Sequence, residues 1–180
     1  MPRMLHNIDY EIYTDGASQF NGQPHARGGW GVVCRFDRSL DGRGFFTYGP
    51  QTNNRYELEA IKKALKIVLK IDGRRRFRIY SDSKYAIGAL TAWIDKWRDN
   101  GWVTCSGKPV KNRDLIESID DLLCYLYSDG KLVELIHVRG HQSNYFNEKA
   151  DGLAKLAAEE NDTGFQLNQL VSDLRTRCRL

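Results

Sequence analysis

The chain has few cysteines and no long apolar segment, and each shortage excludes a class of protein. The cysteines form no CxxC pair and have no histidine at metal-ligand spacing, which argues against a zinc site. There are four of them: Cys34, Cys105, Cys124 and Cys178. No apolar run approaches the roughly 20 residues that span a bilayer, and nothing resembles a secretory signal. We expect a reduced intracellular protein without membrane contact, cytoplasmic unless it works in a nucleus or an organelle.

The size and charge of the chain set broad limits. With 180 residues, of which 41% are hydrophobic, the chain is long enough to form one hydrophobic core and too short to form two well-packed ones. A single compact domain is therefore expected. Lysine and arginine number 27 against 23 acids, and the resulting net charge of +4 favours polyanions only mildly. We expect a monomer.

Three strands are expected first. Ile8, Tyr10 and Ile12 recur at every second position, the period of a half-buried strand, and this run ends at residues 14–16. Segments 28–36 and 44–49 are bounded by glycine, rich in aromatic or β-branched residues, and separated by a turn-like Asp-Gly pair. This pattern predicts an antiparallel meander of three strands.

Helices and strands then alternate, with helical segments recognised by apolar residues at i, i+3, i+4 and i+7. The expected elements are a helix at 54–73, a strand at 77–81, a helix from Asp82 through Trp93, a helix at 115–126 capped by Asn112, a strand at 132–138 and a helix at 147–160. This order predicts an α/β (α+β) fold, a five-stranded mixed sheet with three antiparallel and then two parallel strands, flanked by helices. We assign the domain to residues 1–160, and residues 161–180 to an irregular C-terminal tail.

Three acids stand where strands end or helices begin. Asp15 and Asp82 each end a strand, and Asp151 lies near the start of a helix. Each one alone is explained by a turn or by helix capping. Several carboxylates that converge beside an apolar core are costly to bury as bare charges, so together they indicate a site for a hard cation.

Short motifs run through nearly the whole chain in a fixed order. They are Tyr-Thr-Asp-Gly at 13–16, Thr-Asn-Asn-Arg-Tyr-Glu-Leu at 52–58, Ser-Asp-Ser-Lys-Tyr at 81–85, and Gly-His at 140–141 followed by Asn-Glu-Lys-Ala-Asp at 147–151. In this order they resemble the sequence blocks of type 1 ribonucleases H. The tryptophans and basic residues between about 93 and 113 look like the basic protrusion of the bacterial-type cellular enzymes.

The resemblance implies the ribonuclease H-like fold and endonucleolytic hydrolysis of the RNA strand of RNA/DNA hybrids, leaving 5′-phosphate and 3′-hydroxyl ends. It also implies two Mg²⁺ ions, with Mn²⁺ as a possible substitute. In that scheme Asp15 bridges both ions, Glu57 and Asp82 complete one site, and Asp151 completes the other. His141 matches a loop histidine that is implied to assist proton transfer or product release.

Residues for holding the hybrid follow from the same resemblance. Thr52 and Asn53 look like part of a pocket for a DNA phosphate, and Asn54 and Lys84 match minor-groove positions. Many relatives have glutamine where this chain has Lys84, so an amide contact would become a charged one. The loop at 21–29 is longer than the family's usual version, which leaves its contacts with 2′-hydroxyl groups open.

The protrusion combines tryptophans with cations, a pattern suited to tracking phosphates. We expect Trp93 to be an anchor in the core. The residues expected to bind substrate there are Trp97, Trp102, Lys96, Arg98, Lys108 and Lys111.

Helix geometry separates two neighbouring glutamates. Glu57 begins the apolar stripe that continues through Ile61 and Leu65, so it should face the sheet and need a partner. Glu59 lies among lysines and should pair with Lys63 one turn later. Glu57 is therefore the expected metal ligand.

Three other functions remain open. The first is an inactive hybrid-binding module, which would keep the basic protrusion but would not need the four acids. All four acids are present in this chain, which argues against it. An integrase or transposase-like relative would share the acids, without the Asn-rich block at 52–54 and the basic protrusion. A domain cut from a reverse transcriptase is the third, although a methionine close before the first strand favours a free-standing enzyme.

Overall fold

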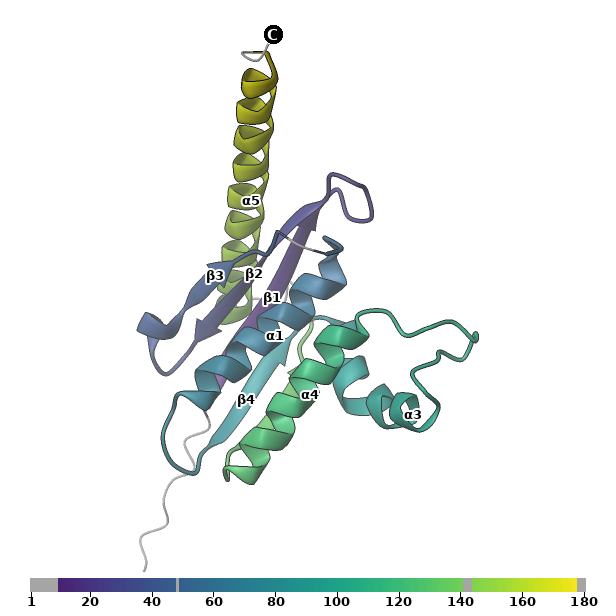
Figure 1. The fold of residues 1–180 in the computed structure, drawn as a ribbon. Coiled ribbons are helices and arrows are strands. Elements are labelled where there is room, and N and C mark those ends of the chain that lie inside the picture. The colour runs from purple at the N-terminus through teal and green to yellow at the C-terminus, as the bar shows by residue number, and fades with distance from the viewer. Residues whose placement is uncertain (1–9, 48, 141–143, 178–180) are drawn as a thin grey trace, which may run out of the picture.

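The computed structural model describes residues 10–47, 49–140 and 144–177, with side chains described through Leu167 (Figure 1). The strands are β1 (Tyr10–Gln19), β2 (Arg27–Cys34), β3 (Gly42–Gly44), β4 (Arg76–Ser81) and β5 (Leu132–His137). They form one sheet in the order β3-β2-β1-β4-β5, in which β1, β2 and β3 pair antiparallel and β4 and β5 join in parallel. The predicted mixed sheet is confirmed, with β1 at its centre.

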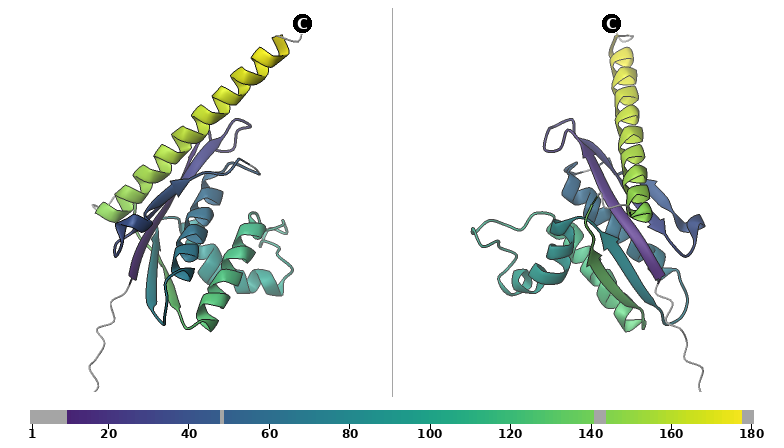
Figure 2. Two further views of the ribbon diagram at one scale, coloured as in Figure 1. Left: turned by 60° about the vertical axis from the view of Figure 1, so that its left-hand side comes forward. Right: turned by 180° about the vertical axis from the view of Figure 1, so that it is seen from behind.

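Helices cover both faces of this sheet. They are α1 (Asn53–Leu69), α2 (Lys84–Gly88), α3 (Ile94–Asp99), α4 (Arg113–Ser128) and α5 (Tyr145–Arg177), with a π-helical turn at Ala89–Trp93 and a short 3-10 turn at Arg38–Leu40. The helices α1 and α4 lie on one face and α5 crosses the other (Figure 2). The main core lies between α1, α4 and the sheet, where Ile12, Ile61 and Ile79 are fully buried.

The third strand is shorter and earlier than predicted. The sequence predicts a strand at 44–49, whereas β3 pairs with β2 only from Trp30–Gly44 to Val32–Gly42. Beyond Gly44 the chain leaves the sheet, because the ring of Phe46 stacks on Tyr56 of α1 with centroids 4.3 Å apart. Packing on the helix therefore replaces pairing within the sheet.

The predicted irregular tail is wrong for residues 161–177, since α5 continues without a break to Arg177. The first residue beyond the predicted boundary, Asn161, is only 4% exposed. Its amide nitrogen donates to the carbonyl of Gly28 at 3.0 Å and to the hydroxyl of Tyr56 at 3.2 Å. One turn further, the guanidinium of Arg27 lies over the ring of Phe165, 3.5 Å from its centroid. The folded unit therefore continues past residue 160.

The helix α5 lies very close to β2. A Cβ built on Gly29 would lie 2.6 Å from the backbone nitrogen of Ala158, and one built on Gly31 would lie 2.8 Å from that of Ala154. Such distances are below any van der Waals contact, so only glycine fits. This glycine–alanine seam sets how near the acid-bearing start of α5 comes to the sheet.

In the part of the chain that the structure describes, every helix is too short or too polar to cross a bilayer.

Candidate active site

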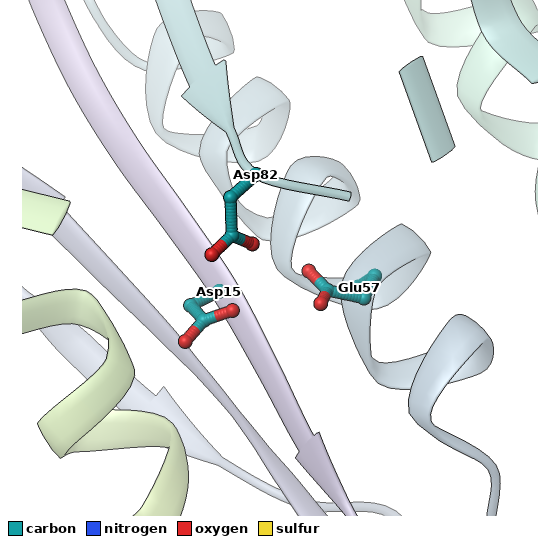
Figure 3. Close-up of side chains that lie close together, drawn as sticks. All are labelled: Asp15, Glu57 and Asp82. Atoms are coloured by element: carbon teal, nitrogen blue, oxygen red, sulfur yellow. The ribbon is translucent and has the colours of Figure 1, made fainter. Parts of the chain in front are cut away.

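Three of the predicted acids meet beside the middle of the central strand β1, at the level where its parallel neighbour β4 ends. Asp15 lies on β1, Glu57 in the second turn of α1, and Asp82 directly after β4 (Figure 3). Each has a carboxylate oxygen within 4.8 Å of the others'. The predicted convergence of these three residues is therefore present in the structure.

The strand register explains why Asp15 and Asp82 are neighbours. The parallel strands β1 and β4 pair Thr14 with Ser81, so the residues that follow, Asp15 on β1 and Asp82 just after β4, are acids at the same level. Below them, the hydroxyl of Thr14 donates to the carbonyl of Tyr80 at 3.0 Å, which ties the two strand ends together.

Glu57 is brought to Asp15 by close packing of α1 on β1. A Cβ built on Gly16 would lie 2.5 Å from the carbonyl carbon of Tyr56 and 2.8 Å from the Cα of Glu57. Because Gly16 has no side chain, the helix backbone rests directly on the strand backbone. The Asp-Gly pair that the sequence could explain as a turn is thus a contact within β1.

The buried acids are electrostatically strained. Glu57 is 4% exposed, and its Oε2 has no hydrogen-bond partner. Burial, and then the charges of Asp15 and Asp82, raise its pKa well above the ordinary value. Burial and the charges of Asp82 and Asp151 raise the pKa of Asp15 to about 8, against a weaker opposing hydrogen bond from the Gly16 N–H.

These observations fit a divalent cation. A cation among the three carboxylates would remove their mutual repulsion and give the Glu57 Oε2 atom a partner. Oxygen donors alone, supplied by several chain segments, suit Mg²⁺ or Mn²⁺ better than zinc.

Asp151 lies in the second turn of α5, beside this group but outside it. Its Oδ2 accepts from Nζ of Lys155 at 2.7 Å, an ion pair across one helical turn. Its charge nevertheless acts on Asp15, whose pKa it helps to raise. The structure thus gathers all four predicted acids, with three at the centre and Asp151 at the edge.

A cleft of about 590 Å³ opens over the acids. Among its lining residues are Asn53, Asn54 and Lys84, which the sequence predicts to bind substrate. The amide nitrogen of Asn53 lies 3.5 Å from Oε1 of Glu57, so this side chain also supports an acid.

The sequence interpretation missed Asn147, which lines the same cleft. Asn147 is 4% exposed, and its Oδ1 has no partner. Its only sequence signal is its place in the motif at 147–151. The predicted proton-transfer residue His141 lies outside the described residues.

A second cleft of about 560 Å³ adjoins the first. Its walls include Thr52, which was predicted for a DNA phosphate, together with Lys111 and the loop residue Asn21. The Oδ1 atom of Asn21 accepts from the Asn53 backbone N–H at 3.2 Å, so the loop at 21–29 is tied to the start of α1. Arg55 also lines this cleft, although it makes a two-pronged ion pair with Asp114.

The basic protrusion comprises α3 and the loop to α4. Lys96, Lys108 and Lys111 are exposed there, as a phosphate-tracking surface requires. Arg98 differs because its guanidinium is already paired with Asp95 and Asp120.

The tryptophans of the protrusion are arranged differently from the prediction. Trp93, expected as a core anchor, is 41% exposed, and this expectation is wrong. Trp102, expected to touch substrate, is only 8% exposed and belongs to the core. Trp97 lies between them, with ring centroids 5.6 Å from Trp93 and 6.2 Å from Trp102.

Together the fold and the clustered acids define a class, the α/β nucleases whose carboxylates for metal ions gather beside the central strand of a mixed sheet. Sequence comparison agrees, since the RNase H family model matches residues 7–159. A ribonuclease H of Thermosynechococcus vestitus is 40% identical over 145 residues, which cover 80% of this chain and 85% of that protein. A ribonuclease H of Clostridium botulinum strain Hall is 37% identical over 151 residues, covering 83% of this chain and 95% of that protein.

Solved structures give the same result. LC9-RNase H1, described as a type 1 RNase H with the type 2 active-site motif, matches with a TM-score of 0.68 and 28% identity, over 84% of this chain and 72% of that one. A foamy viral protease-reverse transcriptase in complex with RNA/DNA hybrid matches with a TM-score of 0.64 and 25% identity, over 88% of this chain and 21% of that one. The chain belongs to the RNase H family and is a ribonuclease H enzyme.

Proposed function

We propose that this enzyme cuts the RNA strand of RNA/DNA hybrids internally and leaves 5′-phosphate and 3′-hydroxyl ends. The observation that carries the proposal is the meeting of Asp15, Glu57 and Asp82 around a buried carboxylate oxygen that lacks a partner. Family membership supplies the substrate class. A related reverse transcriptase has been solved with RNA/DNA hybrid, which supports the same substrate here.

We propose Mg²⁺ as the cofactor, as two ions, with Mn²⁺ able to replace it. When bound, such a pair activates water and neutralises charge on a phosphate undergoing displacement. Asp15 would contact both ions because it lies between the other acids and Asp151. Glu57 and Asp82 would hold one ion, and Asp151 would hold the other after releasing Lys155.

The remaining residues of the two clefts would bind and orient the hybrid. Lys84 and Asn54 lie beside the acids and would contact the minor groove, where 2′-hydroxyl groups distinguish RNA from DNA. Thr52 in the adjoining cleft would contact a phosphate of the DNA strand. The exposed Lys96, Lys108 and Lys111 would follow the backbone further out. We propose His141 for moving a proton near the leaving oxygen.

One chain supplies all four acids, so we expect the monomer to be active. The alternative of an inactive hybrid-binding module has no support in the site, because none of the four acids is replaced. An integrase or transposase-like activity would act on DNA ends instead.

A single assay tests the proposal. RNA/DNA, RNA/RNA and DNA/DNA duplexes with labelled ends are incubated with the enzyme and Mg²⁺, or with a chelator. We expect internal cuts in the RNA of the hybrid alone and no cuts with the chelator. The fragments should carry 3′-hydroxyl and 5′-phosphate ends, which a ligase can rejoin without prior phosphorylation. Cleavage of DNA/DNA duplexes, or cleavage without a divalent ion, would contradict the proposal.

A further inference from the structure

The backbone of Asp82 is held by the end of β5. The pairing of β4 with β5 ends at Ser81 and His137, where the Val138 N–H donates to the Ser81 carbonyl at 3.0 Å. One residue further on, Nε2 of His137 lies 3.2 Å from the carbonyl oxygen of Asp82. Because a carbonyl oxygen only accepts, Nε2 carries the proton of this bond. The imidazole thus extends the strand pairing by one residue beyond its backbone end.

The carboxylate of Asp82 is confined by the same segment of chain. A Cβ built on Gly140 would lie 2.7 Å from Oδ2 of Asp82 and 3.6 Å from its Cγ. The backbone of Gly140 does not have a positive φ, so its conformation suits other residues. What glycine provides here is space for the Asp82 carboxylate, rather than backbone freedom.

Asp82 needs this support more than its two partners do. Asp15 lies within β1, and Glu57 lies within α1 where that helix rests on Gly16, so regular structure holds both. Asp82 lies in the link between β4 and α2, and its side chain is partly exposed. The backbone of a residue in such a connection is not fixed by the hydrogen bonds of a strand or a helix, so the direction of its carboxylate needs other support.

We infer that His137 and Gly140 are positioning residues that hold Asp82 in the geometry needed to bind a metal ion. His137 fixes the Asp82 peptide through its carbonyl, and Gly140 leaves the carboxylate room to face Asp15 and Glu57. This inference rests on the proposed function, since it concerns the affinity of the proposed metal site.

The test measures metal binding to the full chain without substrate, by following the electron paramagnetic resonance signal of free Mn²⁺ during titration. Gly140→Ala and His137→Ala should each weaken Mn²⁺ binding by about tenfold or more, the usual effect of losing a residue that orients a ligand. His137→Gln, which keeps an N–H donor of similar reach, should restore most of the affinity. Gly164→Ala is the matched control, because a Cβ there meets nothing within 4 Å.

Two further measurements make the result decisive. Asp82→Asn defines the loss expected when the ligand itself is removed, and thermal unfolding without metal reports whether a variant is folded. If Gly140→Ala and His137→Ala are folded and bind Mn²⁺ like the wild type while Asp82→Asn does not, the positioning role is refuted and the proposed function stands. If Asp82→Asn also binds like the wild type, the proposed metal site itself is wrong.

Discussion

Gly16 and Glu57 touch backbone to backbone, so closely that a Cβ on Gly16 would lie 2.8 Å from the Cα of Glu57. This contact sets the spacing between the strand that carries Asp15 and the helix that carries Glu57. The absence of one side chain therefore helps to determine the geometry of two acids.

Replacing Gly16 with alanine should destabilise the protein and reduce activity together. The new methyl group has only backbone atoms to displace, so α1 must move away from β1 and carry Glu57 with it. We expect a loss of about 1–3 kcal/mol in the free energy of unfolding, typical of overpacking, and a fall in kcat. Urea unfolding and steady-state kinetics measure the two effects, and a variant with wild-type values for both would contradict the contact.

Replacing Asp15 with asparagine should abolish cleavage and leave hybrid binding largely intact. The change removes the proposed bridging ligand while keeping the size of a side chain that is 6% exposed. Filter binding and cleavage of a labelled hybrid measure the two properties separately. Mg²⁺-dependent turnover by the purified variant would refute the assignment of Asp15.

The two glutamates of α1 should respond in opposite ways to the same substitution. Glu57→Gln should lose nearly all activity at saturating Mg²⁺, because the buried Glu57 carboxylate is a proposed ligand. Glu59→Gln should remain close to the wild type, since Glu59 makes the predicted ion pair with Lys63, at 3.2 Å. Circular dichroism controls for folding, and an inactive Glu59 variant would show that the ligand has been misassigned.

The metal-free enzyme should lose stability as pH rises. The pKa of Asp15 is near 3.8 ordinarily and about 8 in the folded protein, so between these values the folded state binds a proton that the unfolded state lacks. Stability then falls with increasing pH across this window. Thermal unfolding with a chelator at pH 5 and pH 8 measures the fall. Asp15→Asn should reduce it, and a rise in melting temperature towards pH 8 would contradict the raised pKa.

Removing cations from the protrusion should flatten the salt dependence of hybrid binding. Each lysine that contacts a phosphate contributes about 0.9 to the slope of log K against log salt. Replacing Lys96, Lys108 and Lys111 with alanine should therefore lower that slope by about 2–3 and raise KM, with little change in kcat. Arg98 is better tested alone, because its ion pairs with Asp95 and Asp120 engage its charge within the protein.

A matched triple variant controls for the loss of charge. Lys62 and Lys66 lie four residues apart on α1, and Lys70 follows as its C-cap, all outside the protrusion at about 93–113. Their replacement should leave the slope close to that of the wild type. Equal slopes in the two triple variants would show that the protrusion does not touch phosphate.

The sheet and most of the helices follow from the sequence because their signals are local. Alternation marks β1, helical spacing marks α1 and α4, and the parallel crossovers follow from the order of the elements. The same order placed Asp15 beside Asp82, because β1 and β4 are parallel neighbours and Asp82 directly follows β4. The predicted end of the first strand at residues 14–16 is wrong, since β1 continues to Gln19 through its pairing with β2. Asp151 was singled out by its place near the start of a helix. The motif resemblance added Glu57, and helix spacing independently turned that residue towards the sheet.

The features that were mispredicted depend on distant contacts. Residues 161–180 mix polar and apolar residues without a clear helical period, so the sequence predicts an irregular tail there. Asn161 nevertheless stays helical beside Gly28, which is 133 positions away in the chain. Asn112 shows the same limit: it stands before α4 as predicted, yet its φ is +60° and its side chain donates to the Tyr85 hydroxyl instead of capping the helix.

The contact between α5 and β2 has a consequence for how this enzyme tolerates change. Gly29 and Gly31 lie so close to Ala158 and Ala154 that a Cβ on either glycine would clash with the helix backbone. None of these four residues has a chemical group suited to catalysis. Any larger side chain there would lift the start of α5 and withdraw Asp151 from the other acids. Residues without catalytic chemistry therefore help to place the site, because the backbone contact at Gly29 and Gly31 sets the distance between Asp151 and the acids on the sheet side.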